Sequence, residues 1–185
     1  MKCKWGGAGV KIIDNFLFYD YFKELQKIIY SDNFSWYYHK ATTIYNDDKN
    51  FMFCHMLYNN QSINSECYSK FEPIKYFINR HIDCKELLRV KLNLYPNQGK
   101  KIQHRKHHDW LDKDDKPIKG IKVAILNFTD CNGSTIVDGK EIISKENKAI
   151  LFKNEQEHYG ITQDDKDIRI VLNIVFKQTY FKEPL

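Results

Sequence analysis

The sequence has few of the residues that break or crosslink a chain. It contains eight Gly and four Pro, which excludes a collagen-like or linker-like protein. Its five Cys stand at irregular spacings, which predicts reduced thiols and a cytoplasmic location. The apolar runs extend for only a few residues, and the first residues include no apolar stretch typical of a signal peptide. We therefore expect no membrane association.

Arginine is also scarce, although the net charge is +5. Of the 29 basic residues only four are Arg, and Lys is interspersed with Asp and Glu along the whole chain. Proteins that bind nucleic acid rely on bidentate arginine contacts and on clustered basic residues, so this composition argues against a nucleic-acid partner. Aromatic residues are plentiful instead, with twelve Tyr, twelve Phe and three Trp. A chain of 185 residues with this composition is expected to fold as one domain.

The first part of the chain carries helical patterns. Apolar residues recur at helical spacing over residues 19–29 and again over residues 69–79, which predicts two helices. Residues 51–58 alternate between apolar and polar side chains, which predicts a strand. The polar segments 42–50 and 59–65 are expected to be surface loops.

From residue 87 onward, short apolar runs recur between turn residues. They cover residues 88–95, 120–128, 134–137, 148–152 and 168–176. Closely spaced short strands without helices between them are typical of an antiparallel barrel or sandwich. The sequence therefore predicts a mainly β protein with flanking helices. The single domain, 1–185, would consist of a helical flank with early strands (1–86) and a jelly-roll core (87–178).

A His-x-Asp pair is the first candidate for a metal site, and the sequence has two copies. In an extended segment, residues two apart point to the same side, so an imidazole and a carboxylate at this spacing can bind one metal ion. His107 and Asp109 lie in the strand-rich half. His81 and Asp83 lie at the end of a predicted helix, where residues two apart diverge. Taken alone, even the pair at 107 and 109 is compatible with a purely structural role.

Two downstream residues extend this pattern. His158 follows a short apolar strand, and eleven residues later Arg169 opens another apolar strand. An arginine in an apolar strand requires an anionic partner. One alternative is a salt bridge to Asp164, Asp165 or Asp167.

Together these residues match a known site chemistry. Two His and one carboxylate form the facial triad of non-haem ferrous oxygenases, which leaves metal positions open. An Arg supplies a bidentate fork for the distal carboxylate of a dicarboxylic co-substrate.

The chain resembles the 2-oxoglutarate and Fe(II)-dependent oxygenase superfamily, in its prolyl-4-hydroxylase-like branch found in phages and bacteria. The resemblance is carried by residues 89–96 (RVKLNLYP), 107–110 (HHDW), 122–125 (KVAI), 132–135 (NGST) and 158–176. Residues 13–17 (IDNFL) and 53–55 (FCH) match less specifically, so the resemblance covers most of the chain.

This resemblance implies a double-stranded β-helix with N-terminal helices. It implies Fe(2+) on His107, Asp109 and His158, with 2-oxoglutarate as co-substrate and Arg169 on its distal carboxylate. Tyr95 matches a tyrosine that lines the co-substrate pocket. Relatives often carry another tyrosine on the strand that here contains Asn127, and Asn127 is the candidate replacement.

Trp110, beside the iron ligands, is a candidate substrate contact or a cap on the rim of the barrel. The expected activity is hydroxylation of a protein or peptide at proline, with O2 consumed and succinate and CO2 released. The alternatives are the same iron chemistry on a small molecule or nucleobase, and a non-catalytic jelly-roll binding module. The expected location is the cytoplasm, or the host cytoplasm for a viral protein, and the sequence leaves the oligomeric state open. Substrate contacts are expected on the segments 42–65 and 112–119.

Overall fold

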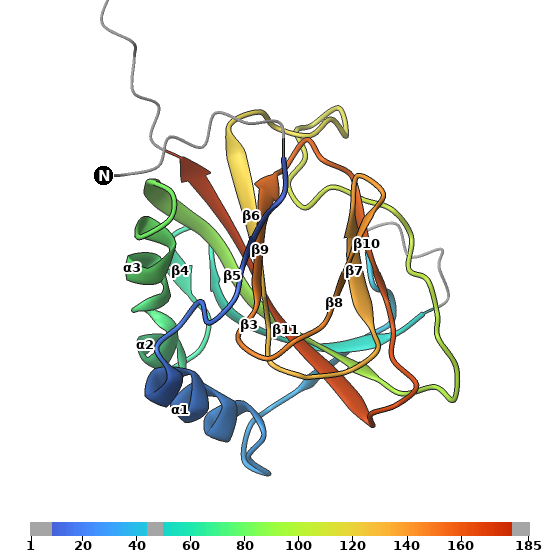
Figure 1. Ribbon diagram of the computed structural model, residues 1–185. Coiled ribbons are helices and arrows are strands. Elements are labelled where there is room, and N and C mark those ends of the chain that lie inside the picture. Colours follow the sequence, from blue (N-terminus) through green and yellow to red (C-terminus); the bar gives the residue numbers. More distant parts are fainter. Residues whose placement is uncertain (1–8, 44–49, 179–185) are drawn as a thin grey trace, which may run out of the picture.

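The computed structural model describes residues 9–43 and 50–178. Two antiparallel sheets face each other, and three helices cover the outer face of the larger sheet (Figure 1). The helices are α1 (Tyr19–Ile29), α2 (Tyr68–Phe71) and α3 (Ile74–Asn79). The strands are β1 (Lys11–Ile13), β2 (Tyr37–His39), β3 (Met52–Asn59), β4 (Ser62–Ile63), β5 (Cys84–Pro96), β6 (Ile121–Asn127), β7 (Ser134–Val137), β8 (Lys140–Ile143), β9 (Ala149–Lys153), β10 (His158–Ile161) and β11 (Ile168–Gln178).

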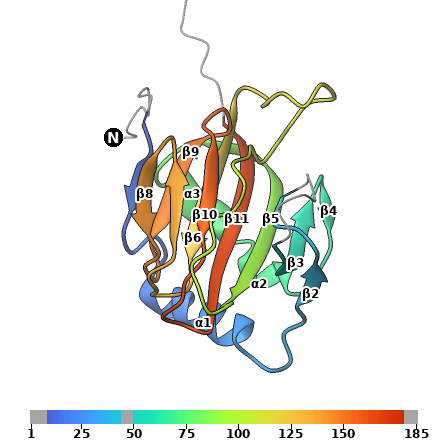
Figure 2. The ribbon, with the colours of Figure 1, turned by 90° about the vertical axis from the view of Figure 1, so that its right-hand side faces the viewer.

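The larger sheet has the strand order β1-β9-β6-β11-β5-β3-β2, with β4 paired to β3. The smaller sheet has the order β10-β7-β8, and Figure 2 shows its strands in front of β6, β9 and β11. Strands adjacent in space are often distant in sequence, as expected for a jelly roll. The predicted fold class, a mainly β jelly-roll core with flanking helices, is confirmed.

The two long strands β5 and β11 lie at the centre of the larger sheet and have two different faces. On β5, Val90, Leu92 and Leu94 pack into the main hydrophobic core under the helices. On β11, alternate residues from Ile170 to Phe176 join the same core. Because strand side chains alternate, the residues between them point to the opposite face, toward the smaller sheet. The functional site lies on that inner face.

The helical segment 69–79 differs from the prediction. It forms two short helices, because the chain breaks at Glu72 and Pro73, and Pro73 caps the start of α3. Proline has no backbone N–H, so Pro73 cannot donate the hydrogen bond that would continue α2, although Glu72 and Pro73 both keep helical backbone angles. The apolar spacing predicted one helix because it does not register this interruption.

The predicted loops also differ in part. Residues 59–65 contain the short strand β4, which forms a hairpin with β3 through Asn60 and Gln61, both with positive φ. Residues 44–49 of the other predicted loop lie outside the described residues. Within the described part of the chain, no helix has the length and apolar character needed to cross a bilayer, and the cysteines there are free.

Candidate metal centre and its cavity

A cavity of about 370 Å³ lies between the two sheets. The inner faces of β5 and β11 form one wall, the smaller sheet contributes Thr135 and His158, and the end of β2 contributes His39. The segment 104–109 closes another side. This volume lies within the range of pockets that hold small molecules.

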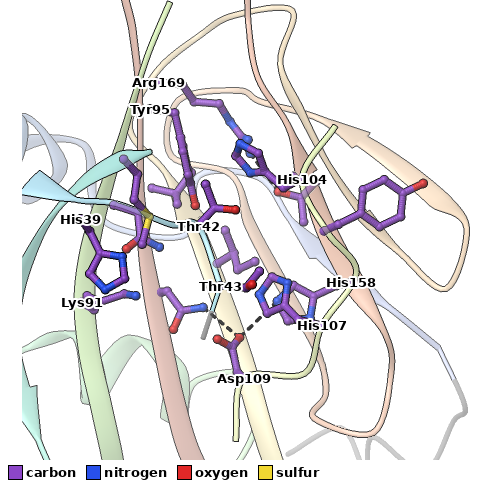
Figure 3. A pocket seen from close by; sticks show the side chains of 18 of the residues that line it. His39, Thr42, Thr43, Lys91, Tyr95, His104, His107, Asp109, His158 and Arg169 are labelled. Carbon is purple, nitrogen blue, oxygen red and sulfur yellow. Dashed lines mark hydrogen bonds and ion pairs between the residues drawn. The ribbon is translucent and has the colours of Figure 1, made fainter. Parts of the chain in front are cut away.

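The structure brings His107, Asp109 and His158 together at this cavity. Their potential ligand atoms all lie within 4.8 Å of one another. The segment before His107 runs antiparallel to β10, and His107 and His158 exchange backbone hydrogen bonds of 3.0 and 3.1 Å. This pairing places the two imidazole rings side by side, with centroids 4.4 Å apart. Figure 3 shows all three side chains directed to the same end of the cavity.

The second His-x-Asp copy lies elsewhere. His81 stacks on Phe16 at 5.7 Å, and neither His81 nor Asp83 belongs to a potential metal-binding group among the described residues. His104 also lies away from the three ligands: it packs on the ring of Tyr95 at 5.0 Å. Of the seven histidines, only the two predicted ones combine with a carboxylate in this way within the described chain.

Asp109 is held by three neighbours. Arg89 Nη2 donates to Asp109 Oδ1, Asn173 Nδ2 donates to Oδ2 at 2.9 Å, and His158 Nε2 lies 3.2 Å from Oδ2. Burial alone would raise the pKa of Asp109, but the charge of Arg89 and the contact with His158 hold it well below its usual value. The carboxylate is therefore ionised and oriented, as a metal ligand must be.

His107 is electrostatically suited to the same role. Burial, followed by the neighbouring His158, lowers the pKa of His107 to about 4, so the ring is neutral at pH 7. Its Nδ1 lies 3.1 Å from the carbonyl oxygen of Arg105, a contact that requires the proton on Nδ1. Nε2 then carries the free lone pair, which is the form that binds metals.

This donor set fits a divalent first-row metal. Two imidazoles and one carboxylate suit ferrous iron and its neighbours, and within the described residues no fourth His, Cys, Asp or Glu joins the group. The remaining coordination positions are thus left for small ligands, and the cavity provides space for them.

Arg169 occupies the other end of the cavity, near Tyr95 (Figure 3). Its side chain is only 1% exposed. Arg169 Nη2 donates to Thr135 Oγ1 at 2.9 Å and to Asn127 Oδ1 at 3.5 Å, and Nη1 donates to the carbonyl of Ile161 at 3.4 Å. All these acceptors are neutral, and burial lowers the pKa of Arg169.

The alternative salt bridge of Arg169 is wrong for the described residues. Asp164 and Asp165 instead accept hydrogen bonds from Asn132, and the described chain provides no ion pair to Arg169. Its Nε has no hydrogen-bond partner there either. A fully buried guanidinium with only neutral partners is therefore available to an anionic ligand that enters the cavity.

Two glycines make room for this guanidinium. A Cβ atom at Gly133 would lie 3.0 Å from Arg169 Cδ, and one at Gly160 would lie 3.5 Å from its Nη1. Thr135 was not singled out as a site residue, although it lies in the matching segment 132–135, and it is the nearest hydrogen-bond partner of Arg169.

The remaining predicted residues are placed as follows. Tyr95 lines the cavity beside Arg169, whose Cζ lies 5.9 Å from its ring centre. Asn127 accepts a hydrogen bond from Arg169 and another from Ser144, and its amide nitrogen donates to the carbonyl oxygen of Lys148. Trp110 does not line this cavity.

The Trp110 ring packs instead against the small cluster of Leu88, Ile121 and Val175. This placement favours the packing role for Trp110. Of the two segments expected to contact substrate, the first reaches the cavity with Thr42 and Thr43, whereas residues 112–119 do not line it.

Two charged cavity residues were also missed by sequence reasoning. Arg89 and Lys91 lie on the inner face of β5, in the alternating series that also includes Asn93 and Tyr95. The signal was the alternation of polar residues with Val90, Leu92 and Leu94, which is visible in the sequence but does not say which face holds the site.

The fold and the site together define a class of protein: a double-stranded β-helix with a His-Asp-His group in its cavity. Solved structures that share this fold include a 2OG-Fe(II) oxygenase family member and prolyl hydroxylases, so the resemblance noted in the sequence is confirmed for the fold. The sequence matches no protein-family model and no curated protein.

Three solved structures illustrate the likeness. A 2OG-Fe(II) oxygenase family oxidoreductase from Burkholderia pseudomallei has a TM-score of 0.69 and 11% identity, over 97% of this chain and 94% of its own. A Trichoplax adhaerens prolyl hydroxylase, solved with a peptide of the hypoxia-inducible factor oxygen degradation domain, has a TM-score of 0.63 and 14% identity, over 92% and 84%. The α-ketoglutarate-dependent epimerase SnoN of nogalamycin biosynthesis has a TM-score of 0.65 and 9% identity, over 92% and 79%.

Proposed function

We propose that this protein is a 2-oxoglutarate- and Fe(II)-dependent dioxygenase that hydroxylates a protein or peptide at proline. The observation that carries the proposal is the pairing of two sites in one cavity: a His-Asp-His group at one end, and a buried arginine without an acidic partner among the described residues at the other. A dicarboxylate that extends from the metal to the arginine would give the metal a ligand and the arginine an anionic partner.

The spacing of the two sites supports a shared ligand. Arg169 and Asn173 lie on the same face of β11, four residues apart, and Asn173 donates to Asp109. Four strand residues span about 13 Å between Cα atoms. The arginine side chain covers part of that distance. The distance that remains is comparable to the length of a five-carbon diacid together with its bond to the metal.

The residues of the chain have distinct roles in this mechanism. His107, Asp109 and His158 would hold Fe(2+), and Arg169, supported by Thr135, would hold the distal carboxylate of 2-oxoglutarate. With O2, the iron and co-substrate supply the oxidative decarboxylation to succinate and CO2 and the hydroxylation of a C–H bond. Arg89 and Asn173 orient the carboxylate of Asp109, so that it would be held ready to bind the metal.

The prolyl and peptide parts of the proposal are supported by one of the solved structures. The Trichoplax neighbour is a prolyl hydroxylase bound to a peptide fragment. The epimerase neighbour shows that the fold also serves other reactions, so small-molecule chemistry is the second candidate. The complete set of ligands and the free arginine oppose a non-catalytic binding module.

The proposal is tested by thermal melts under nitrogen, with Mn²⁺ in place of Fe²⁺. We expect 2-oxoglutarate to raise the melting temperature when Mn²⁺ is present and much less when it is absent. A wild-type protein that is not stabilised by 2-oxoglutarate would refute the oxygenase function. With Fe²⁺ and air, succinate formation then measures turnover, and a screen of proline-containing peptides for the mass of one added oxygen atom tests the substrate.

A further inference from the structure

Lys91 is a charged residue in the cavity that the proposed mechanism does not use. It lies on the inner face of β5, and in the register it faces Asn173 on β11 and Met56 on β3. Neighbouring strands are about 4.8 Å apart, so Lys91 lies one strand away from Asn173, the residue that donates to Asp109. Figure 3 shows Lys91 across the cavity from His107 and His158. Its ammonium is near enough to Asp109 for the charge of that carboxylate to act on the pKa of Lys91.

Lys91 has no partner among the described residues. The structure gives its ammonium neither a hydrogen bond nor an ion pair there, whereas Arg89 binds Asp109 and Asn173, and Arg169 has three acceptors. Burial, followed by repulsion from Arg89, lowers the pKa of Lys91 to about 8, so the side chain is still mainly charged at pH 7. A half-buried charged group without a partner is poorly solvated, which makes it receptive to an incoming anion.

The charges of the residues that line the cavity also favour an incoming anion. Among the described residues that line it, three are cationic, namely Arg89, Lys91 and Arg169, and one is a carboxylate, Asp109. Arg89 offsets Asp109. A divalent metal ion and dianionic 2-oxoglutarate offset each other, so the described residues leave the loaded cavity with an excess of two positive charges. Such a cavity favours a substrate that brings negative charge.

We propose that Lys91 forms an ion pair with a carboxylate of the substrate that is oxidised. This inference rests on the proposed function and narrows its substrate class to molecules with a carboxylate near the reacting carbon. That carboxylate belongs either to the main chain, as in a free amino acid or a C-terminal residue, or to an Asp or Glu side chain beside the reacting residue. The small cavity requires the carboxylate to lie only a few bonds from the oxidised carbon.

The test uses matched acids and amides on protein saturated with Mn²⁺ and 2-oxoglutarate under nitrogen. L-proline against L-prolinamide tests the main-chain source. N-acetyl-Pro-Glu-amide against N-acetyl-Pro-Gln-amide tests the side-chain source. Binding is measured by calorimetry. We expect the acid of one pair to bind the wild type at least ten-fold more tightly than its amide, and that pair identifies the source.

Two variants separate Lys91 from the rest of the site. In Lys91→Met the preference for the acid should disappear, and in Lys91→Arg most of it should remain. Both variants should keep the wild-type stabilisation by 2-oxoglutarate, which also shows that they are folded. The inference is overturned if neither acid binds the wild type better than its amide, or if Lys91→Met keeps the preference.

It is also overturned if Lys91→Met loses the stabilisation by 2-oxoglutarate while Arg169→Met keeps it, because Lys91 would then serve the co-substrate. A wild type that 2-oxoglutarate does not stabilise at all would instead refute the proposed function, so the two failures are distinguishable.

Discussion

Replacement of Arg169 by methionine should have opposite effects on the free and the ligand-bound protein. In the free protein Arg169 is buried with neutral partners only, among the described residues. A buried cation without an anion is costly, and methionine fills a similar volume without a charge. We therefore expect Arg169→Met to melt at the wild-type temperature or above it when no ligand is present.

The same variant should lose most of its response to 2-oxoglutarate. Loss of one partner of a buried, hydrogen-bonded charge pair costs about 2–5 kcal/mol, and the lower value already weakens binding about 30-fold. At a ligand concentration about 100 times the wild-type Kd, 2-oxoglutarate stabilises the wild type by about 2.7 kcal/mol, and the variant by about 0.9 kcal/mol. For a chain of this size these values correspond to about 5–11 °C and about 2–4 °C.

The assay is a thermal melt with Mn²⁺ under nitrogen, with and without 2-oxoglutarate. Arg169→Lys is the matched control, because it keeps the charge and loses the planar fork, so it should recover only part of the response. A structural role predicts a different result. If Arg169→Met lowered the melting temperature of the free protein by about 6 °C or more, as the loss of a buried ion pair would, and 2-oxoglutarate still stabilised it fully, the reasoning would be refuted.

Three further predictions concern the metal centre and its neighbours. Asp109→Ala should abolish Mn²⁺ binding measured by calorimetry, whereas His81→Ala, in the unused His-x-Asp copy, should leave it unchanged; the reverse result would mean that the wrong copy was chosen. Arg89→Met leaves the buried carboxylate of Asp109 without its cation and should lower the free energy of unfolding of the metal-free protein by about 3 kcal/mol. Addition of Mn²⁺ should then raise this free energy, measured by urea titration, by more in the variant than in the wild type, and an equal rise in both would contradict this. Burial, followed by repulsion from Arg89 and opposed by Asp109 and Cys54, lowers the pKa of Lys91 to about 8. Because only its protonated form attracts a carboxylate, the affinity for the acid probe should fall as pH rises from 7 to 9, and in Lys91→Arg this fall should vanish.

The strands of the core could be predicted because their signals are local. The run 88–95 lies within β5 (Cys84–Pro96), and the run 168–176 lies within β11 (Ile168–Gln178). Their ends were less certain, since pairing with a neighbouring strand extends β5 beyond its apolar run. The short edge strands β1 and β2 carry no such signal, because three residues do not establish a period.

The ligands could be proposed from spacing because one pair is local. His107 and Asp109 needed only an extended backbone to lie on one side. His158 reaches them because residues 103–107 pair with β10, a contact between segments 51 to 58 residues apart that no local pattern reveals. The choice of His158 and Arg169 therefore depended on the resemblance as well as on the chemistry of the side chains.

The roles of Arg89 and Lys91 could not be separated by sequence. Both are cations on the same face of β5, two residues apart, and the sequence does not show which of them pairs with a carboxylate. The register decides between them: Lys91 lies directly opposite Asn173, whereas Arg89 reaches Asn173 diagonally with its longer side chain and also binds Asp109. The arginine fork can bind the carboxylate and the amide oxygen together, which a lysine ammonium does less well. Because Arg89 takes the single carboxylate among the described lining residues, none of these residues supplies an anion to Lys91, and we propose that the substrate does.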